Sequence, residues 1–570
     1  MLRAFFRLVA ALFKLVFFPL LLLRRSRAAA PGSYVEVEIA GQLADIVPRR
    51  LLLDWRQRRA VSLFALDELA TEILGDSRVK GLLVHLRSMA GGMAAAQSLR
   101  GILSRVRAAG REVVVVLPDG GDTKAVYVAT AASRVIVGPQ STLYPLGFAV
   151  STSYFRGVLD KVGVVPEILA HGKYKSAGEQ LVRSSMSEPQ REQVGALLGL
   201  MHETLVLAIG EGRNVTPERA AAIVDGAPYI ADQAVAAGLV DGVAYDDELP
   251  AKIAEGVARA RIVPGARYLG ARRATRLGPI LPEAVIGVVR VHGAIAHGSG
   301  NAVGLATDKA VIRAVRLARM NRRVRGVVLH IDSPGGSALA SDRIPHELVP
   351  LAAQKPLIAC MANVAASGGY YVAAAAHAIV AQPTTITGSI GVVAARVAFE
   401  PLLARLGIVN EVVKRGARAD LMNPARALTE DERGALLREI EGVYGAFVRV
   451  VAAGRKRTVE AIEEVAQGRV WTGRDAVGAG RVDELGGFDL ALDLVRRKLG
   501  PGAERLQPAV IRPPRRALPP MAPRVATPAA LLEILRVLGG SLEADLALAW
   551  FLAGSSERTL AWCPVAIAAR

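Results

Sequence analysis

Two glycine-rich turns in the second half of the chain have the residue types of a nucleophilic site. The stretch Asp332–Ser337 reads DSPGGS, and residues 365–370 read AASGGY; each follows a short apolar run. A serine at a strand-to-helix turn, here Ser367, exposes its Oγ, and the glycines after it let the backbone approach a substrate carbonyl closely. Backbone N–H groups from two such turns can bind a developing oxyanion. The pattern predicts acyl transfer at Ser367, and two ordinary tight turns are the alternative interpretation.

A serine nucleophile needs a base, and histidine is the usual one. None of the eight histidines lies in a GxSxG context. His330 has a counterpart, His85, in a part of the chain without a nucleophile turn, and His377 falls in a helical stretch after Ser367. We therefore expect these histidines to be structural and do not predict a Ser-His-Asp triad.

The stretch GKYKSAG, residues 172–178, offers lysine as the alternative base. It lacks the GxxxxGK[ST] spacing of a phosphate-binding loop. A lysine acts as a general base only when neutral, so burial would have to lower its pKa. Lys173 and Lys175 are both candidates, and a solvated basic loop is the alternative interpretation when the stretch is taken alone.

The chain contains an internal duplication. Residues repeat at an offset of 244: Gly92 with Gly336, Tyr127 with Tyr371, Pro139 with Pro383, Gly163 with Gly407, Glu167 with Glu411, and Gly172 with Gly416. Two copies of about 240 residues are too few for a solenoid and predict two homologous domains.

Each copy retains the half of a site that the other has lost. The position equivalent to Ser367 is Thr123, and the glycines that follow the serine are also missing there. The positions equivalent to Lys173 and Lys175 are alanines. We infer one composite site in which Ser367 meets a lysine of the first copy, and a domain interface would supply the burial that the lysine needs. The repeat does not separate the two lysines.

Alternating apolar runs and helical segments predict layered α/β domains. Residues 113–118 and 356–362 are short apolar runs suited to parallel strands, and helical patterns lie at 64–74 and 307–318. The predicted organisation is a membrane anchor or interfacial helix (1–27), a first repeat that supplies the lysine (31–248), a connector (249–282), a second repeat that supplies the serine (283–500), and a Pro/Arg-rich linker with an apolar tail to which no role is assigned (501–570).

The N-terminus carries a membrane signal. Residues 1–23 are apolar except for Arg3, Arg7 and Lys14, which fall on one face of a helix. That pattern is typical of an interfacial amphipathic helix, although about 20 residues also just cross a bilayer. We expect retained membrane attachment rather than a cleaved export signal. Spanning and interfacial placements both stay open, and so does orientation.

The net charge, the cysteines and the absence of metal-binding motifs limit which partners, metals and cofactors we expect. The net charge is +19, but the chain lacks a zinc-finger pattern, an RNP-like strand and a dense basic helix. An anionic membrane surface is therefore a better partner than nucleic acid. Cys360 and Cys563 form no CxxC motif, and HExxH spacing is absent. We predict no metal and no cofactor.

Four motifs together resemble a known family. The stretches GKYKSAGEQ, DSPGGS, AASGGYY and TGSIGVV occur in this order, within a resemblance that covers roughly residues 34–500. They resemble the long, duplicated bacterial form of signal peptide peptidase A, a family of membrane-bound Ser-Lys proteases. The resemblance implies a Clp protease/crotonase-like fold of repeated ββα units, Ser367 as nucleophile and Lys175 as general base.

The resemblance also implies the remaining features of the site. Gly336 and Gly368 would supply the oxyanion N–H groups, and Ser389 would orient the lysine. The substrates would be cleaved signal peptides and other unfolded peptides. The protein would be a homo-oligomer, expected to be a tetramer, in the bacterial inner membrane with its catalytic part on the extracytoplasmic side.

Two other functional classes remain as hypotheses. A crotonase-type acyl-CoA enzyme uses similar paired N–H groups but would need no serine nucleophile, and a catalytically inactive scaffold would not depend on Ser367. The sequence leaves open the cleavage-site preference. It also leaves open whether Ser367 and Lys175 pair within one chain or between subunits.

Overall fold

The computed structural model describes residues 16–47, 61–254, 257–275, 283–298, 304–512, 559–562 and 568–569. The first 15 residues, which carry most of the N-terminal membrane signal, lie outside the described residues. Helix α2 (Phe18–Ser26) begins after them and exposes Leu20, Leu22 and Leu23.

The first copy is built on a mainly parallel sheet with the strand order β11-β6-β4-β3-β1-β12, and β2 pairs with β1. Valine and leucine fill the central strands, such as β4, which are buried on both faces as parallel strands require. The strands of this sheet are β1 (Ser33–Ala44), β2 (Val61–Ser62), β3 (Val79–Ala90), β4 (Glu112–Leu117), β6 (Arg134–Val137), β11 (Gly242–Val243) and β12 (Ile262–Pro264).

The first copy also contains helices and strands outside this sheet. The helices are α3 (Leu63–Leu74), α4 (Met93–Ala108), α5 (Thr123–Ala129), α6 (Arg156–Val162), α7 (Glu179–Val182), α8 (Glu188–Arg213), α9 (Pro217–Asp225), α10 (Ala231–Ala236), α11 (Leu249–Lys252) and α12 (Gly265–Ala274). The remaining strands are β5 (Gly121–Asp122), β7 (Thr142–Tyr144), β8 (Phe148–Ala149), β9 (Val165–His171) and β10 (Tyr229–Ile230). The predicted connector thus contributes β12 and α12 to the first copy.

The second copy repeats the plan with the order β22-β20-β18-β16-β13-β24, and β19 and β23 join through β18. Its strands are β13 (Val285–His292), β14 (Ala294–Ala296), β15 (Leu305–Thr307), β16 (Val324–Ser333), β17 (Gly335–Ser337), β18 (Leu357–Ala366), β19 (Ala378–Ala381), β20 (Ile386–Gly388), β21 (Val392–Ala398), β22 (Val470–Thr472), β23 (Glu484–Leu485) and β24 (Gln507–Val510). Its helices are α13 (Asp308–Met320), α14 (Ala338–Ala352), α15 (Gly368–Ala373), α16 (Glu400–Arg405), α17 (Glu430–Arg455), α18 (Val459–Val465), α19 (Gly473–Gly478) and α20 (Phe488–Leu499).

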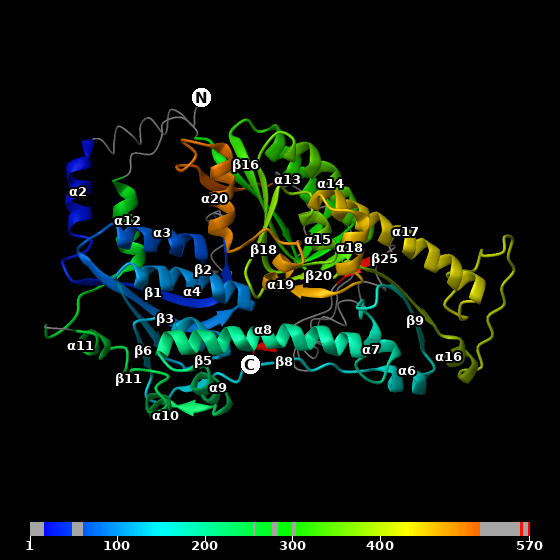
Figure 1. The fold of residues 1–570 in the computed structure, drawn as a ribbon, viewed down its shortest axis with the longest axis horizontal. Coiled ribbons are helices and arrows are strands. Elements are labelled where there is room, and N and C mark those ends of the chain that lie inside the picture. The colour runs from blue at the N-terminus through cyan, green and yellow to red at the C-terminus, as the bar shows by residue number, and fades with distance from the viewer. Residues whose placement is uncertain are drawn as a thin grey trace.

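The main sheet strands and the longest helices of the two copies correspond. The parallel neighbours β1, β3, β4 and β6 of the first copy match β13, β16, β18 and β19 of the second, and the 26-residue helices α8 and α17 match each other. The predicted duplication and the mixed α/β class are therefore confirmed. Figure 1 shows the first copy in blue to green and the second in green to orange, with α8 running along the first copy.

Strand β9 leaves the first copy and joins the second. It pairs antiparallel with β21, from Val165 opposite Ala398 to His171 opposite Val392. The resulting mixed sheet has the order β15-β14-β17-β25-β21-β9, where β25 (Thr559–Trp562) comes from the C-terminal tail. Figure 1 places β9 beside α6 and α16, away from the sheet of its own copy.

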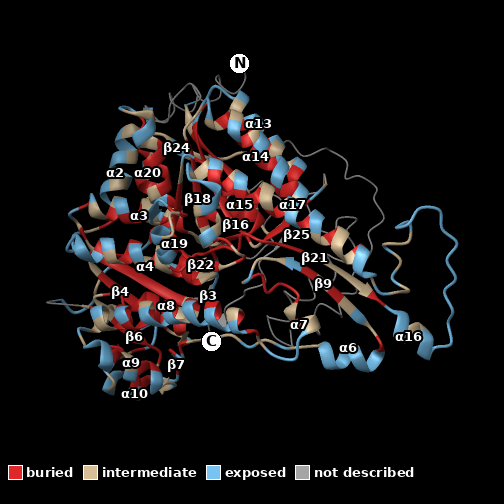
Figure 2. Cartoon of the chain, turned by 45° about the vertical axis from the view of Figure 1, so that its right-hand side comes forward, coloured by how far each residue is buried: buried red, intermediate tan, exposed pale blue. Residues whose placement is uncertain are grey.

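The apolar cores follow the duplication. One large cluster of buried side chains joins the sheet and helices of the first copy, and another does so in the second copy. Figure 2 shows the buried residues concentrated in the strands and on the inward faces of the helices. Among the described residues, α8 is the helix long and apolar enough to cross a membrane; half of its apolar stretch is buried inside the protein, as in a core helix.

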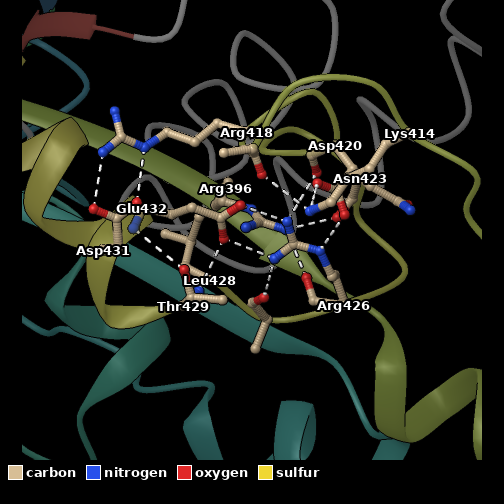
Figure 3. A network of polar contacts seen from close by, with 12 residues as sticks. Arg396, Lys414, Arg418, Asp420, Asn423, Arg426, Leu428, Thr429, Asp431 and Glu432 are labelled. Atoms are coloured by element: carbon tan, nitrogen blue, oxygen red, sulfur yellow. Dashed lines mark hydrogen bonds and ion pairs between the residues drawn. The ribbon is translucent and has the colours of Figure 1, made fainter.

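A network of hydrogen bonds and ion pairs stabilises the segment that connects β21 and α17 (Figure 3). Arg426 donates to Glu432 at 2.5 and 2.7 Å and to Asp420 at 2.8 Å. The guanidinium of Arg426 lowers the pKa of Glu432 to about 2. Arg396 of β21 forms an ion pair at 3.3 Å with Glu167 of β9. The network therefore also supports the strand that crosses between the copies.

Candidate active site

Ser367 stands at a sharp turn between β18 and α15. Its backbone angles are φ 52° and ψ −117°, in a region that a residue with a side chain seldom adopts. Its N–H donates to the carbonyl of Gly388 at 2.7 Å, which holds the turn against the end of β20. The side chain is fully buried. Such strain at a strand-to-helix turn is typical of a residue whose side chain is held for chemistry.

Lys175 lies directly against this serine. Its Nζ is 2.9 Å from Ser367 Oγ, although 192 residues separate the two in sequence. The same Nζ is 3.1 Å from the carbonyl oxygen and 3.1 Å from the Oγ of Ser389. Lys175 is 5% exposed and Ser389 2%. The contact forms within one chain, and it brings together the two halves that the repeat comparison predicts.

The crossing strand β9 carries Lys175 to its place. After β9 ends at His171, the chain turns, and the N–H of Tyr174 donates to the carbonyl of Gln467 in the second copy at 2.8 Å. Glycines leave room for the lysine. A Cβ on Gly468 would lie 2.6 Å from the backbone nitrogen of Lys175, and one on Gly391 would lie 3.0 Å from its Cδ.

The competing base candidates lie elsewhere. Lys173 is exposed, and its Nζ stands 5.1 Å from the centre of the Tyr174 ring. His330 bonds to Asp45 at 2.6 Å, and His377 Nδ1 accepts from the N–H of Leu357 at 3.0 Å. The structure thus separates the two lysines, which the repeat comparison leaves open.

Ser389 stands beside Ser367 because their strands are neighbours. Ala366 of β18 pairs with Gly388 of β20, so the residues that follow both strands emerge together. Ser389 also has a positive φ, 53°, and its N–H donates to the carbonyl of Arg469 at 2.7 Å. Its hydroxyl and carbonyl therefore face Lys175 from a fixed backbone.

Of the two predicted oxyanion glycines, Gly368 directly follows Ser367, and Gly336 lies in β17, which contacts α15. Gly368 is the first residue of α15, where a backbone N–H has no partner within the helix. Gly336 has φ 150° and lies in β17, and a Cβ there would come within 2.0 Å of the Ile295 carbonyl oxygen. Glycine at position 336 is therefore required by the backbone and by the close approach of β14.

Gln193 is a supporting residue that sequence reasoning missed. Its side chain on α8 is buried, and its amide nitrogen donates to the carbonyl of Tyr174 at 3.2 Å and to Ser176 Oγ at 3.3 Å. Its amide oxygen accepts from the N–H of Val470 at 3.1 Å. One side chain thus links the lysine loop to β22 of the second copy. Gln193 belongs to none of the sequence motifs, and comparison of the two copies does not single out this glutamine within a helix.

A second series of hydrogen-bonded side chains comes from β13 and β16, the strand that leads into the DSPGG turn. Arg290 donates to Nδ1 of His292 at 2.9 Å, so the other ring nitrogen, Nε2, carries the proton that bonds to Nδ1 of His330 at 2.7 Å. His330 in turn donates to Asp45 of the first copy. Burial, followed by the charges of His330 and Arg290, holds the pKa of His292 well below its usual range.

Metal ligation has no support in the part of the chain that the structure describes. No cluster of three or more histidine, cysteine, aspartate or glutamate side chains suited to a metal ion occurs there. Cys360, one of the two cysteines, is a buried thiol whose pKa is raised by burial.

Comparison with known proteins is consistent with this geometry. Peptidase family S49 matches residues 105–259 and 350–500, one segment in each copy. Serine protease SPPA, chloroplastic, of Arabidopsis thaliana is 32% identical over 476 residues, which cover 82% of this chain and 69% of the relative. Protease 4 of Salmonella typhi is 31% identical over 443 residues, 76% of this chain and 71% of its own length.

Two further similarities are partial. A protein of Enterococcus faecium named as a signal peptide peptidase SppA is 36% identical over 179 residues, 31% of this chain and 52% of its own. The solved structure of ClpP1 from Listeria monocytogenes covers 35% of this chain and 91% of its own at 15% identity, with a TM-score of 0.22, too low to define a shared fold. The family match and the long relatives establish that this chain belongs to peptidase family S49 and is a protease.

Proposed function

We propose that the protein is a membrane-associated serine endopeptidase with a Ser-Lys dyad, and that it degrades cleaved signal peptides and other unfolded peptides. The observation that carries the proposal is the 2.9 Å contact between Lys175 Nζ and Ser367 Oγ. A buried lysine beside a serine on a strained turn has the arrangement of an activated nucleophile. A Clp protease/crotonase-like fold belongs to the same proposal.

The proposed reaction has two steps. Neutral Lys175 takes the proton of Ser367 Oγ as that oxygen attacks the peptide carbonyl, and the oxyanion binds to the N–H groups of Gly336 and Gly368. The protonated lysine then gives its proton to the leaving amine, which leaves an acyl-enzyme. Water, activated by the same lysine, hydrolyses the ester and restores Ser367. Burial favours this cycle because it disfavours the ammonium form of lysine.

The repeat itself supports the predicted oligomer. Residues 407–416 of the second copy are equivalent to 163–172 of the first, which include the crossing strand β9. In the second copy the equivalent segment forms no strand, and Val409 and Val413 are 90% and 95% exposed. Figure 2 shows this segment as an exposed loop beyond α16. Exposed apolar residues in the position of a sheet-pairing strand favour docking on a neighbouring copy.

Helix α2 supports the proposed membrane association. The exposed leucines of α2 and the basic residues at its end, Arg24 and Arg25, are suited to the surface of an anionic bilayer. The name of the Enterococcus relative supports the proposal that signal peptides are substrates. The inner-membrane location, the extracytoplasmic side and the tetramer stay proposals drawn from the family resemblance.

The decisive experiment is hydrolysis of a fluorogenic apolar peptide in mild detergent. Ser367→Ala and Lys175→Ala should each lower kcat by roughly 10³-fold or more, because each removes one half of a functional unit. The matched control is Lys173→Ala, which should keep near-normal activity because that side chain is exposed. A mixed oligomer of the two inactive variants should not recover activity, since the contact between Lys175 Nζ and Ser367 Oγ lies within one chain.

Two outcomes would contradict the proposal. Activity that survives Lys175→Ala but not Ser367→Ala would mean that another group is the base. Failure of a serine-reactive fluorophosphonate to label Ser367, together with no hydrolysis by the wild type across a broad peptide set, would favour the scaffold or acyl-CoA hypotheses instead.

A further inference from the structure

A strand from the C-terminal tail lies next to the proposed catalytic residues. Strand β25 pairs antiparallel with β17, with Trp562 opposite Gly335, Ala561 opposite Gly336 and Leu560 opposite Ser337. On its other side it pairs antiparallel with β21, where Leu560 is opposite Val393. An extended segment that fills the gap between two strands satisfies the backbone groups of both, which is how many proteins bind peptides.

The position of β25 is the one that a peptide substrate would need. Gly336, paired with Ala561, is the residue to which the proposed function assigns an oxyanion N–H. Strand β21, on the other side, continues from the turn that contains Ser389 and pairs with the lysine-bearing arm β9. Ser367 is 0% exposed in this arrangement, so a substrate carbonyl cannot reach it unless something moves. Of the described elements around Ser367, β25 is the one that belongs to neither repeat, because it lies in the C-terminal tail.

A second contact holds the same tail. Strand β26 (Ala568–Ala569) pairs antiparallel with β8 of the first copy, so the tail contacts both copies. The 46 residues between Arg512 and Thr559 are long enough when extended to span about 150 Å, so chain length does not restrict the docking. A tethered segment of this kind has an effective concentration of the order of millimolar, which lets weak pairing compete with a free peptide.

We propose that the C-terminal segment Thr559–Trp562 occupies the substrate groove as an intramolecular inhibitor and must leave before a peptide can bind. The proposal rests on the proposed function, because it takes the groove beside Ser367 as the peptide-binding site. It gives a role to the predicted apolar tail, which sequence reasoning leaves without one. If the groove is open for a tenth of the time, the apparent KM for a peptide is about tenfold higher than for an open groove.

The first test weakens β25 within the full chain. Ala561→Pro removes a backbone N–H and introduces a ring into a strand with neighbours on both sides, so it should release the segment. We expect kcat/KM for a fluorogenic apolar peptide to rise about tenfold, mainly through a lower KM. The matched control is Ala526→Pro in the Pro/Arg-rich linker, which should leave kcat/KM unchanged. Unchanged or lower activity in Ala561→Pro overturns the proposal.

The second test detects the docking without catalysis. Val393→Cys with Leu560→Cys, in a Cys563→Ser background, places thiols at paired positions and should form a disulfide that is seen by mass spectrometry of the non-reduced protein. The control pair is Val397→Cys with Leu560→Cys. It moves one thiol four residues, about 13 Å, along the same face of β21 and should not link. Absence of the bond in the first pair overturns the docking.

The two tests separate this proposal from the proposed function. The disulfide should form equally in a Ser367→Ala background, because strand pairing does not need the nucleophile. If it forms but no variant hydrolyses peptide, the peptidase proposal fails and the docking stands. The intact mass of the wild type should correspond to the full chain. A Ser367-dependent loss of the tail would make the segment a substrate rather than an inhibitor and would overturn the proposal.

Discussion

The amide oxygen of Gln193 accepts a hydrogen bond from the backbone N–H of Val470 at 3.1 Å, and this bond crosses from the first copy to the second. The amide nitrogen of the same side chain holds the lysine loop through Tyr174 and Ser176. The position of Lys175 relative to Ser367 therefore depends on a buried residue that hydrogen-bonds to neither. We regard Gln193 as a positioning residue.

Gln193→Leu should reduce kcat by about 10- to 100-fold with little change in KM. Leucine keeps the volume but leaves the Val470 N–H and the Tyr174 carbonyl without this partner, and a buried unsatisfied group costs about 1–3 kcal/mol. The matched control is Gln190→Leu on the same helix, which removes a bond from Tyr154 at 3.1 Å but none of the bonds that Gln193 makes to the lysine loop. Both variants should lose similar stability to urea. Equal kcat values in the two variants would show that Gln193 is only structural.

The sequence predicts that Ser367 meets a lysine of residues 172–178, but it does not predict which strand brings the lysine there. Comparison of the two copies singles out Ser367 and the lysines of residues 172–178 because a duplicated pair of domains that share one site no longer needs both halves in each copy. The structure adds that the lysine arrives on β9, which crosses to pair with β21. Alternation of apolar residues predicts a strand but not which sheet it joins.

The roles of Gln193 and β25 cannot be recognised from the local sequence. The role of Gln193 depends on three partners that are brought together only by the packing of α8 on the second copy. The docking of β25 depends on the space between β17 and β21, while its own sequence, TLAW, is a short apolar run like many others. Both depend on long-range contacts that periodicity and motif spacing do not contain.

Ser389→Ala should lower kcat by about tenfold. The Oγ of Ser389 is 3.1 Å from Lys175 Nζ, and its loss removes one of the contacts that hold the amine against Ser367, while the Ser389 carbonyl remains. A net contribution near 1.5 kcal/mol for such a bond corresponds to about tenfold. Ser389→Gly should give the same loss although it relaxes the positive φ, which distinguishes the hydroxyl from the backbone.

The control for Ser389 is a serine of similar burial in another place. Ser341 on α14 is also buried, and its Oγ donates to the carbonyl of Ser337 at 2.7 Å. Ser341→Ala should change thermal stability slightly and leave kcat unchanged. Full activity in Ser389→Ala, measured at saturating peptide, would remove Ser389 from the site.

Gly336→Ala should destabilise the fold and abolish hydrolysis. At φ 150° an alanine is strained, and its Cβ would lie 2.0 Å from the Ile295 carbonyl oxygen, so β14 and β17 must separate. We expect a loss of about 2–3 kcal/mol in the free energy of unfolding. Gly101→Ala on α4 is the control: no atom lies within 4 Å of its Cβ position, and it should stabilise by about 0.5–1 kcal/mol. Denaturant unfolding of both variants measures the difference, and a Gly336→Ala protein as stable as wild type would contradict the steric argument.

Acid should weaken the fold through His292 before it titrates the carboxylates. The pKa of His292 is held well below its usual value near 6.5 by burial and by His330 and Arg290. Above about pH 6.5 the ring is neutral in both the folded and the unfolded chain and adds no pH dependence. Below that pH the unfolded chain binds a proton that the folded chain excludes, so the free energy of unfolding falls, by up to about 1.4 kcal/mol per pH unit.

His292→Gln isolates this contribution because glutamine stays neutral at every pH. The variant loses the bonds to Arg290 and His330 as well, so it should be less stable than wild type at pH 7.5, and only the slope between pH 6.5 and 5 tests the argument. Urea unfolding at several pH values should show a shallower fall in the variant than in the wild type. Parallel slopes would mean that His292 takes up its proton in the folded state, so that the chain from Arg290 to Asp45 admits a charge despite its burial.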